Sequence, residues 1–253
     1  METKFNNLVK IMDELREKCP WDKKQTIHSL RTMTIEETYE LSDGIISSDW
    51  INIKEELGDL LLHILFYSKI ATEEKHFTID DVIEGISKKL IQRHPHIYGN
   101  VIVNDEHDVK KNWEKIKISE GKKSVLSGVP KSMNALPKAH CIQEKVKKVG
   151  FEWKEIDDVW KKVEEEIAEL KEAIETKNEN HIEEEFGDVL FSLVNYARFL
   201  KIDAEAALEK VNQKFISRFM LMEETAEQQQ LHLSDLSLEE MDIIWNKVKQ
   251  KTV

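Results

Sequence analysis

The sequence predicts an all-α fold made of two tandem, duplicated helical-bundle domains, and two observations support this prediction. Only 8 glycines and 4 prolines occur in 253 residues, and Glu, Lys, Leu and Ile are abundant, so propensity favours helix nearly everywhere. Six acids also recur with a constant offset of 129 residues (165 − 36 and 188 − 59). Glu36, Glu37, Glu40, Glu55, Glu56 and Asp59 return as Glu165, Glu166, Glu169, Glu184, Glu185 and Asp188. The chain is therefore a tandem duplication.

Helices in the first copy are predicted from apolar spacing and from residues that begin or end helices. Thr34 and Glu37 have the spacing of a capping box, which places the start of the acid-bearing helix at Thr34. The next helix is apolar nearly all round after Asp59, which is typical of a bundle interior. The predicted helices are 5–18, one from 34 onward, 51–72 and 78–93, followed by a short extended piece at 101–103.

A polar stretch at 119–137 separates the two copies, and its glycines and prolines are typical of a linker. The predicted domains are therefore 1–118 and 138–253. Short connections between successive helices favour antiparallel bundle packing. In the second copy, helices are predicted at 138–149, 159–176, 181–200, 204–227 and 238–249.

Composition narrows the class of protein. Lys and Arg total 37 against 49 Asp and Glu, and the net charge of −12 argues against binding nucleic-acid polymers through their phosphates. The 2 cysteines form no CxxC pair, and the first residues contain no apolar signal core. The most hydrophobic run, 60–67, is short for a membrane span. We expect a soluble, cytoplasmic protein with reduced thiols and no membrane partner.

The repeated acids form an EExxE and an ExxD segment in each copy. Helical residues three and four apart lie on one side, so several carboxylates would converge and repel each other unless cations bind. Oxygen ligands favour Mg²⁺, with Mn²⁺ as a substitute, over zinc. One such motif alone is more often a solvated helix face, but two motifs in each copy favour a metal site per half. The predicted ligands are Glu36, Glu37, Glu40, Glu56 and Asp59, then Glu165, Glu166, Glu169, Glu184, Glu185 and Asp188.

Basic residues are also repeated near these acids. Lys89 with Arg93 corresponds to Lys214 with Arg218, and a Trp followed four residues later by Lys recurs at Trp113 and Trp245. Basic side chains beside a predicted cation site suit a polyphosphate ligand. Each Trp would either stack on a base or pack in a core, and core packing is the commoner role.

Two glycines within the ExxD segments need an explanation, because a glycine inside a helix costs about 1 kcal/mol relative to alanine. A close helix crossing and the close approach of a metal or ligand explain Gly58 and Gly187 equally well. Other phosphate or metal chemistry finds no support. The sequence has no GxxxxGK[ST] loop, and its one ExxH, from Glu73 to His76, lacks the second ExxH of a di-iron bundle.

These motifs together resemble the MazG nucleoside triphosphate pyrophosphohydrolases, within the all-α nucleotide pyrophosphatase group. In the first copy the resemblance rests on CPWDKKQT at 19–26, TIEETYEL, EELGDLL, and RHPHIYG at 93–99. In the second copy it rests on KVGFEW, VEEEIAEL, EEEFGDVLF and KFISRF, with the closing Trp245 and Lys249. The resemblance covers essentially the whole chain.

The resemblance implies a homodimer that uses Mg²⁺ to hydrolyse nucleoside triphosphates to the monophosphate and pyrophosphate. It implies catalytic and metal-binding roles for Glu165, Glu166, Glu185 and Asp188, with Glu169 as a further ligand and Glu184 beside them. It also places Lys214, Arg218 and Lys249 on phosphates and Trp245 on the nucleoside. In some relatives the second domain does most of the catalysis. Glu166 is the candidate general base, and His181 departs from relatives that have a lysine there.

Two other functions stay open on the residues alone. An acidic helical dimer could be a non-enzymatic regulatory or interaction module whose cations are structural. An ordinary phosphatase would instead release orthophosphate. Resolving the nucleotide and phosphate products distinguishes these hypotheses from pyrophosphohydrolysis.

Overall fold

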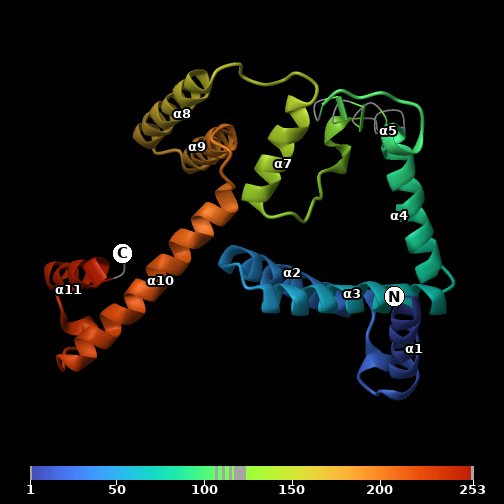
Figure 1. Cartoon of the computed structure of the whole chain (residues 1–253). Helices are drawn as coiled ribbons and strands as arrows, with labels where there is room; N and C mark the ends of the chain where they lie inside the picture. Colours follow the sequence, from blue (N-terminus) through green and yellow to red (C-terminus); the bar gives the residue numbers. More distant parts are fainter. Residues whose placement is uncertain (1, 106–107, 110–111, 114–115, 117–123, 252–253) are drawn as a thin grey trace. The chain divides into compact units, whose positions relative to one another are not determined.

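The predicted all-α class is confirmed. The computed structural model describes residues 2–105, 108–109, 112–113, 116 and 124–251, and within these residues the regular structure is helical, with no strand (Figure 1). Contacts divide the chain into two compact units, Met1–Ile116 and Lys117–Val253, which are considered separately below. In the described part of the chain, no helix is both long and apolar enough to cross a membrane.

The first unit is built around a pair of long helices. Helix α3 packs against α2 on one side and contacts α1 and α4. Its core is formed by Met12, Leu30, Leu65, Phe66 and Ile70, all nearly inaccessible to solvent. The elements are α1 (Glu2–Lys18), η1 (Asp22–Lys24), α2 (Ile27–Ser47), α3 (Trp50–Glu73), α4 (Ile79–Arg93) and α5 (Pro95–Tyr98).

The predicted start of the acid-bearing helix at Thr34 is wrong. Helix α2 begins at Ile27, because Thr26 and Ser29 form a reciprocal capping box about two turns before Thr34. Thr34 lies inside the helix, where its hydroxyl donates to the Leu30 carbonyl oxygen at 3.0 Å and is 2.8 Å from the Tyr67 hydroxyl. A mid-helix threonine commonly makes this bond to the carbonyl four residues back.

The second unit repeats the long helix pair and adds a helical hairpin. Helix α8 packs on α9, α7 contacts α9, and α11 folds back along α10 (Figure 1). A separate core of Met222, Ala226, Ile244 and Val248 holds the α10–α11 hairpin together. The elements are η2 (Val125–Gly128), α7 (Ala135–Lys147), α8 (Ile156–Thr176), α9 (Glu179–Phe199), α10 (Ala204–Gln228), η3 (Leu233–Asp235) and α11 (Leu238–Lys251).

Helix ends differ from the predictions where caps or prolines were misread. Helix α7 begins at Ala135, three residues before the predicted start, and includes Pro137 in its first turn. A proline is tolerated there because first-turn N–H groups have no partner within the helix. Residues 101–103 have no assigned secondary structure, so the predicted extended piece is absent. Residues 119–123 of the predicted linker lie outside the described residues.

Helix α3 is less interior than its sequence predicted. Leu65, Phe66 and Ile70 are buried, but Leu57 and Ile64 are exposed. The helix is apolar nearly all round because its two sides face different surroundings. One side packs within the unit, and the other is a solvent-accessible apolar strip in the single chain.

Candidate metal centres

Two helix hairpins, α2–α3 and α8–α9, carry the repeated acids in equivalent positions. Each hairpin turns through a residue with positive φ, Ser48 at 58° and Lys177 at 56°, and these are 129 residues apart (177 − 48). The second helix of each pair is then capped by a side chain, Asp49 for α3 and Asn178 for α9. Such tight turns bring EExxE on the first helix opposite ExxD on the second.

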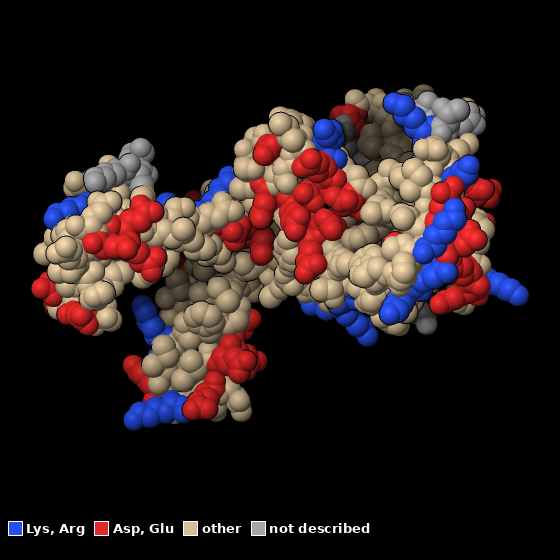
Figure 2. Space-filling model, turned by 90° about the horizontal axis from the view of Figure 1, so that it is seen from below, with Lys and Arg blue, Asp and Glu red and all other residues tan. Residues whose placement is uncertain are grey.

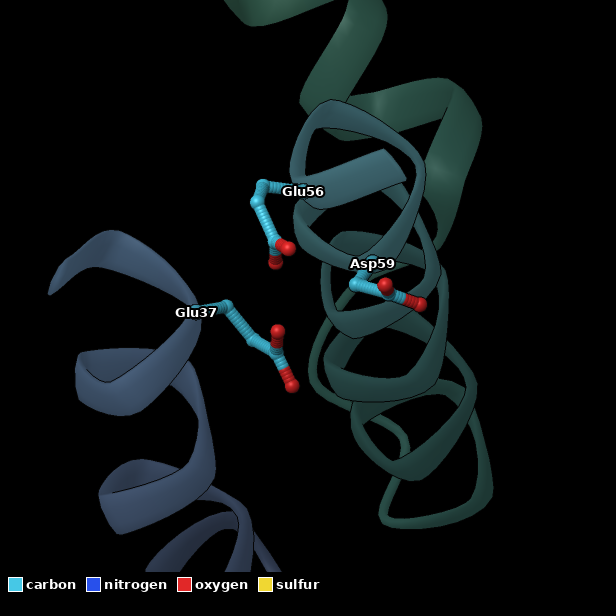
Figure 3. Close-up of side chains that lie close together, drawn as sticks. All are labelled: Glu37, Glu56 and Asp59. Atoms are coloured by element: carbon cyan, nitrogen blue, oxygen red, sulfur yellow. The ribbon is translucent and has the colours of Figure 1, made fainter. Parts of the chain in front are cut away.

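The first hairpin forms an N-terminal triad of Glu37, Glu56 and Asp59. One carboxylate oxygen from each residue lies within 4.8 Å of the other two. Figure 3 shows the Glu37 carboxylate on α2 facing that of Glu56 on α3, with Asp59 one turn further along α3. Glu56 is only 6% exposed, which is rare for an acidic side chain. Three clustered carboxylates with so little solvent are costly without a cation.

One oxygen of Glu56 has a partner and the other does not. Asn52, one turn earlier on α3, donates from Nδ2 to Oε1 at 3.0 Å. The other oxygen, Oε2, is buried and has no hydrogen-bond partner among the described residues. An unsatisfied buried carboxylate oxygen beside two further carboxylates is the donor set that a hard divalent cation binds. The residues therefore fit the predicted metal.

The pKa of Glu37 also reflects the repulsion among the carboxylates of the N-terminal triad. Burial, and then the neighbouring Glu56, Asp59 and Glu40 carboxylates, raise the pKa of Glu37 to about 7. His63 lies one turn beyond Asp59 and is 7% exposed. Burial lowers its pKa more than Asp59 raises it, so His63 is a neutral neighbour and not a counter-ion at pH 7.

The second hairpin forms a C-terminal triad of Glu166, Glu185 and Asp188, again with three oxygens within 4.8 Å of one another. Glu166 is 7% exposed, and Oε2 of Glu185 is buried without a hydrogen-bond partner among the described residues. Here the chain supplies a lysine and a histidine as neighbours. Lys162 Nζ lies 2.6 Å from Glu165 and 2.8 Å from Glu166, and His181 Nδ1 lies 3.5 Å from Glu185.

The two glutamates that Lys162 contacts hold its side chain in the charged form. Hydrogen bonds to Glu165 and Glu166 raise the pKa of Lys162, so its ammonium stays charged throughout the physiological range. Burial and the Glu166 carboxylate raise the pKa of Glu169. The acids of the second hairpin therefore lie beside one positive charge of the chain, the Lys162 ammonium group.

The other predicted acids surround the triads without joining them. They are exposed, and none belongs to a group of three converging oxygens in the described part of the chain. Glu40 and Glu169 lie near enough to act on the charge of their triads, and Glu165 pairs with Lys162. These surrounding acids are Glu36, Glu40, Glu165, Glu169 and Glu184. Acidic side chains also gather in patches elsewhere on the surface (Figure 2).

The predicted phosphate and nucleoside residues lie on the α10–α11 hairpin. Lys214 and Arg218 are one turn apart on α10, and Lys249 is exposed on α11. Trp245 packs against the α10–α11 core, with its ring 5.2 Å from that of Phe215. This placement bears out the core-packing role for the tryptophan. The triad and these residues belong to different hairpins of the same unit.

Three residues of the sites were not singled out from the sequence. Lys162 and Asn52 each lie four residues before a triad glutamate, so i to i+4 spacing would have indicated both. Gly44 was missed because it stands apart from the acids. A Cβ at Gly44 would lie 2.3 Å from Oδ1 of Asn52, so this glycine provides the room for Asn52 to reach Glu56.

The glycines that were singled out have a different setting from the one expected. A Cβ added at Gly58 or Gly187 would meet nothing within 4 Å. No helix of the chain therefore crosses closely at either position in the described residues. A close crossing within the described chain therefore does not explain these glycines.

Comparison with known proteins yields one family and several full-length relatives. The model of the MazG nucleotide pyrophosphohydrolase domain matches residues 25–98 and 155–222, which include both triads. A nucleoside triphosphate pyrophosphohydrolase/pyrophosphatase MazG of Thermotoga maritima is 46% identical over 250 residues, covering 97% of this chain and 95% of that protein. A nucleoside triphosphate pyrophosphohydrolase of Escherichia coli K12 is 37% identical over 260 residues, covering 98% of each.

A further relative is a longer protein. The uncharacterized protein YabN of Bacillus subtilis is 49% identical over 252 residues, covering 97% of this chain but 52% of YabN. The chain thus spans about half of that relative and nearly the full length of the Thermotoga and Escherichia proteins.

Proposed function

The chain belongs to the MazG nucleotide pyrophosphohydrolase family, and from that premise we propose that it hydrolyses nucleoside triphosphates to the monophosphate and pyrophosphate with Mg²⁺. The observation that carries the proposal is the C-terminal triad, with its converging carboxylates and its unpartnered Glu185 oxygen. Mn²⁺ is expected to substitute for Mg²⁺, because both accept oxygen ligands in near-octahedral geometry.

The acids of α8 and α9 would hold the metal. Glu166, Glu185 and Asp188 supply the converging oxygens, with Glu165, Glu169 and Glu184 around them. Mg²⁺ bound there supplies Lewis acidity toward phosphoryl oxygens and offsets the negative charge that builds up on them. We propose that Glu166, the most buried acid of the triad, accepts a proton from the attacking water.

Positive charge around the C-terminal triad favours this site over its N-terminal counterpart for a polyphosphate. Lys162 and His181 lie at the triad itself. We propose that Lys214 and Arg218 of α10, with Lys249 of α11, contact phosphates as well, and that an edge of Trp245 contacts the nucleoside. Because Trp245 is only half-buried against its core, it can serve both packing and stacking.

We also propose that the protein is a homodimer. Helices α3 and α9 present apolar side chains to solvent at matching positions of the two copies. Leu57, Leu61 and Ile64 on α3 correspond to Phe186, Leu190 and Leu193 on α9, each 129 residues later, and all six are exposed in the single chain. A strip of this kind on both acid-bearing helices is the surface that a second copy would cover.

A cytoplasmic location accompanies this proposal. Cys19 and Cys141 are both free thiols, and reduced cysteines are the rule in the cytoplasm. The protein would then work where its nucleotide substrates are made and used.

The proposal is tested by the products. We expect ATP or dCTP with Mg²⁺ to give the monophosphate and pyrophosphate, resolved by anion exchange or ³¹P NMR. A diphosphate with orthophosphate would contradict the proposal and favour a phosphatase. No turnover of any triphosphate by the folded protein would favour the non-enzymatic regulatory module.

A further inference from the structure

The two triads differ in the side chains at two equivalent positions beside them. Lys162, which bridges Glu165 and Glu166, corresponds in the first copy to Met33 (162 − 129 = 33). Met33 packs against the core of the first unit. His181, beside Glu185, corresponds to Asn52, a neutral amide that donates to Glu56.

Glu37 lies among other carboxylates. Those of Glu56 and Asp59 converge with it in the triad, and Glu40 follows it by one turn on α2. The N-terminal triad also holds an independent mark of a missing ligand. Glu56 is 94% buried, since 6% of it is exposed, and its Oε2 has no hydrogen-bond partner among the described residues. Figure 3 shows the Glu56 carboxylate turned toward Glu37.

We propose that the two triads bind their cations under different conditions. The N-terminal triad holds a divalent cation without nucleotide, as a standing structural ion. The C-terminal triad, already bridged by Lys162, binds its cation weakly alone and takes it up together with a triphosphate.

The reason is competition between a lysine and a metal ion for the same carboxylate. A cation that binds Glu166 competes with the ammonium group, which forms a charge-assisted hydrogen bond with Oε1 at 2.8 Å. A triphosphate offers that ammonium group other anionic oxygens, so nucleotide binding would release the carboxylate for the metal. This second step rests on the proposed function. In the described part of the chain, no lysine or arginine is paired with a carboxylate of the N-terminal triad, and a cation there relieves repulsion directly.

Mn²⁺ binding to the metal-free full chain tests the proposal without any turnover. Equilibrium dialysis counts bound Mn²⁺, first without nucleotide and then with the non-hydrolysable α,β-methylene analogue of ATP. Without nucleotide, we expect Glu56→Gln to abolish the tightest Mn²⁺ binding and the matched Glu185→Gln to leave it in place. With the analogue, we expect extra Mn²⁺ to bind, and Glu185→Gln to remove only this extra metal.

An exchange of the two differing residues provides the sharper test. Lys162→Met should create a second site that binds Mn²⁺ without nucleotide, at least about tenfold tighter than in the parent chain, roughly the worth of one charge-assisted hydrogen bond. Met33→Lys should weaken the N-terminal site by a similar factor. Circular dichroism confirms that each variant is folded, and Lys162→Gln, which also lacks the charge, should behave as Lys162→Met does.

Three results would overturn the proposal. They are no nucleotide-free binding by the parent chain, equal loss in Glu56→Gln and Glu185→Gln, and unchanged affinity in both lysine-removing variants. The proposed function fails separately, through the wrong products or none. A chain with nucleotide-free binding at Glu56 but no hydrolysis would keep the N-terminal half of the inference and reject the proposed function.

Discussion

The two acid-bearing hairpins share their turns, helix positions and triad residues, yet differ in the side chains next to the triads. In the first hairpin an amide bonds Glu56, a neutral histidine follows Asp59, and a methionine packed in the core stands at the position of Lys162. The second places Lys162 and His181 against its acids. Duplication has thus kept the carboxylates while their neighbours changed. The side chains beside the triads therefore distinguish the two sites more than the ligands do. The N-terminal site suits a cation alone, and the C-terminal site also suits a polyphosphate.

The largest expected effect is the loss of triphosphate hydrolysis when the metal is removed. We expect excess EDTA to abolish triphosphate hydrolysis, because the C-terminal triad loses the ion that offsets phosphate charge. Added Mg²⁺ or Mn²⁺ should restore it. Ca²⁺ should bind yet support little turnover, because its larger and looser coordination positions the reactants poorly. A steady-state assay of pyrophosphate release measures each case, and full activity in EDTA would contradict any catalytic role for the acids.

Metal should also stabilise the two units unequally. Mg²⁺ at a hundred times its Kd adds about 2.7 kcal/mol to the free energy of unfolding, which raises a melting midpoint by several degrees. Without nucleotide, Glu56→Gln should reduce this rise more than Glu185→Gln does. Melting curves in EDTA and in millimolar Mg²⁺ measure the difference. An unchanged midpoint would mean that the acids are a solvated surface.

The pH dependence of the metal-free protein should carry the signature of Glu37. Its pKa is raised to about 7 in the folded chain, so the folded state holds more protons than the unfolded state once the pH exceeds 4.5, the ordinary pKa of a glutamate. Stability should therefore fall as the pH rises through 7. His63, whose pKa is lowered, gives the opposite slope below its ordinary range.

Melting in EDTA between about pH 5 and pH 8 measures this slope. Glu37→Gln removes the titrating carboxyl and leaves His63 in place, so the variant should lose less stability across the range than the parent chain. An equal slope in both proteins would show that the N-terminal triad is not the source.

The smallest expected effect concerns the room for Asn52. Gly44→Ala gains about 1 kcal/mol of helix propensity, but its Cβ would lie 2.3 Å from Oδ1 of Asn52. Asn52 must then turn away, which costs about 1 kcal/mol through its hydrogen bond to Glu56, so the net change should be near zero. In an Asn52→Ala background the same substitution should stabilise. Urea unfolding of the four proteins measures the cycle, and equal effects in both backgrounds would contradict the contact.

Much of the fold and of the triads could be predicted from the sequence. Helix propensity and the 129-residue offset gave the class and the duplication, because both depend on composition and local spacing. The EExxE and ExxD segments named every triad residue, but spacing cannot show which acids converge, and Glu36 and Glu184 lie outside. Thr34 was misread because a stronger reciprocal cap, Thr26 with Ser29, lies just before it.

The sequence also could not show which side chains from neighbouring helices contact each other. The sequence favours core packing over base stacking for Trp245, but it could not show that the ring lies against Phe215. Gly44 carries no signal of its own, because its purpose depends on a side chain from the next helix.

The claim that the second hairpin performs the chemistry is tested most directly by matched double variants. Glu166→Gln with Asp188→Asn, and the equivalent Glu37→Gln with Asp59→Asn, change the same charges at equivalent positions. Under equal folding by circular dichroism, the first pair should lower kcat for triphosphate hydrolysis by at least about a hundredfold, as expected when a Lewis-acid site is lost. The second pair should cost clearly less. If the Glu37 and Asp59 variant is the inactive one, the assignment of catalysis to the C-terminal triad is wrong.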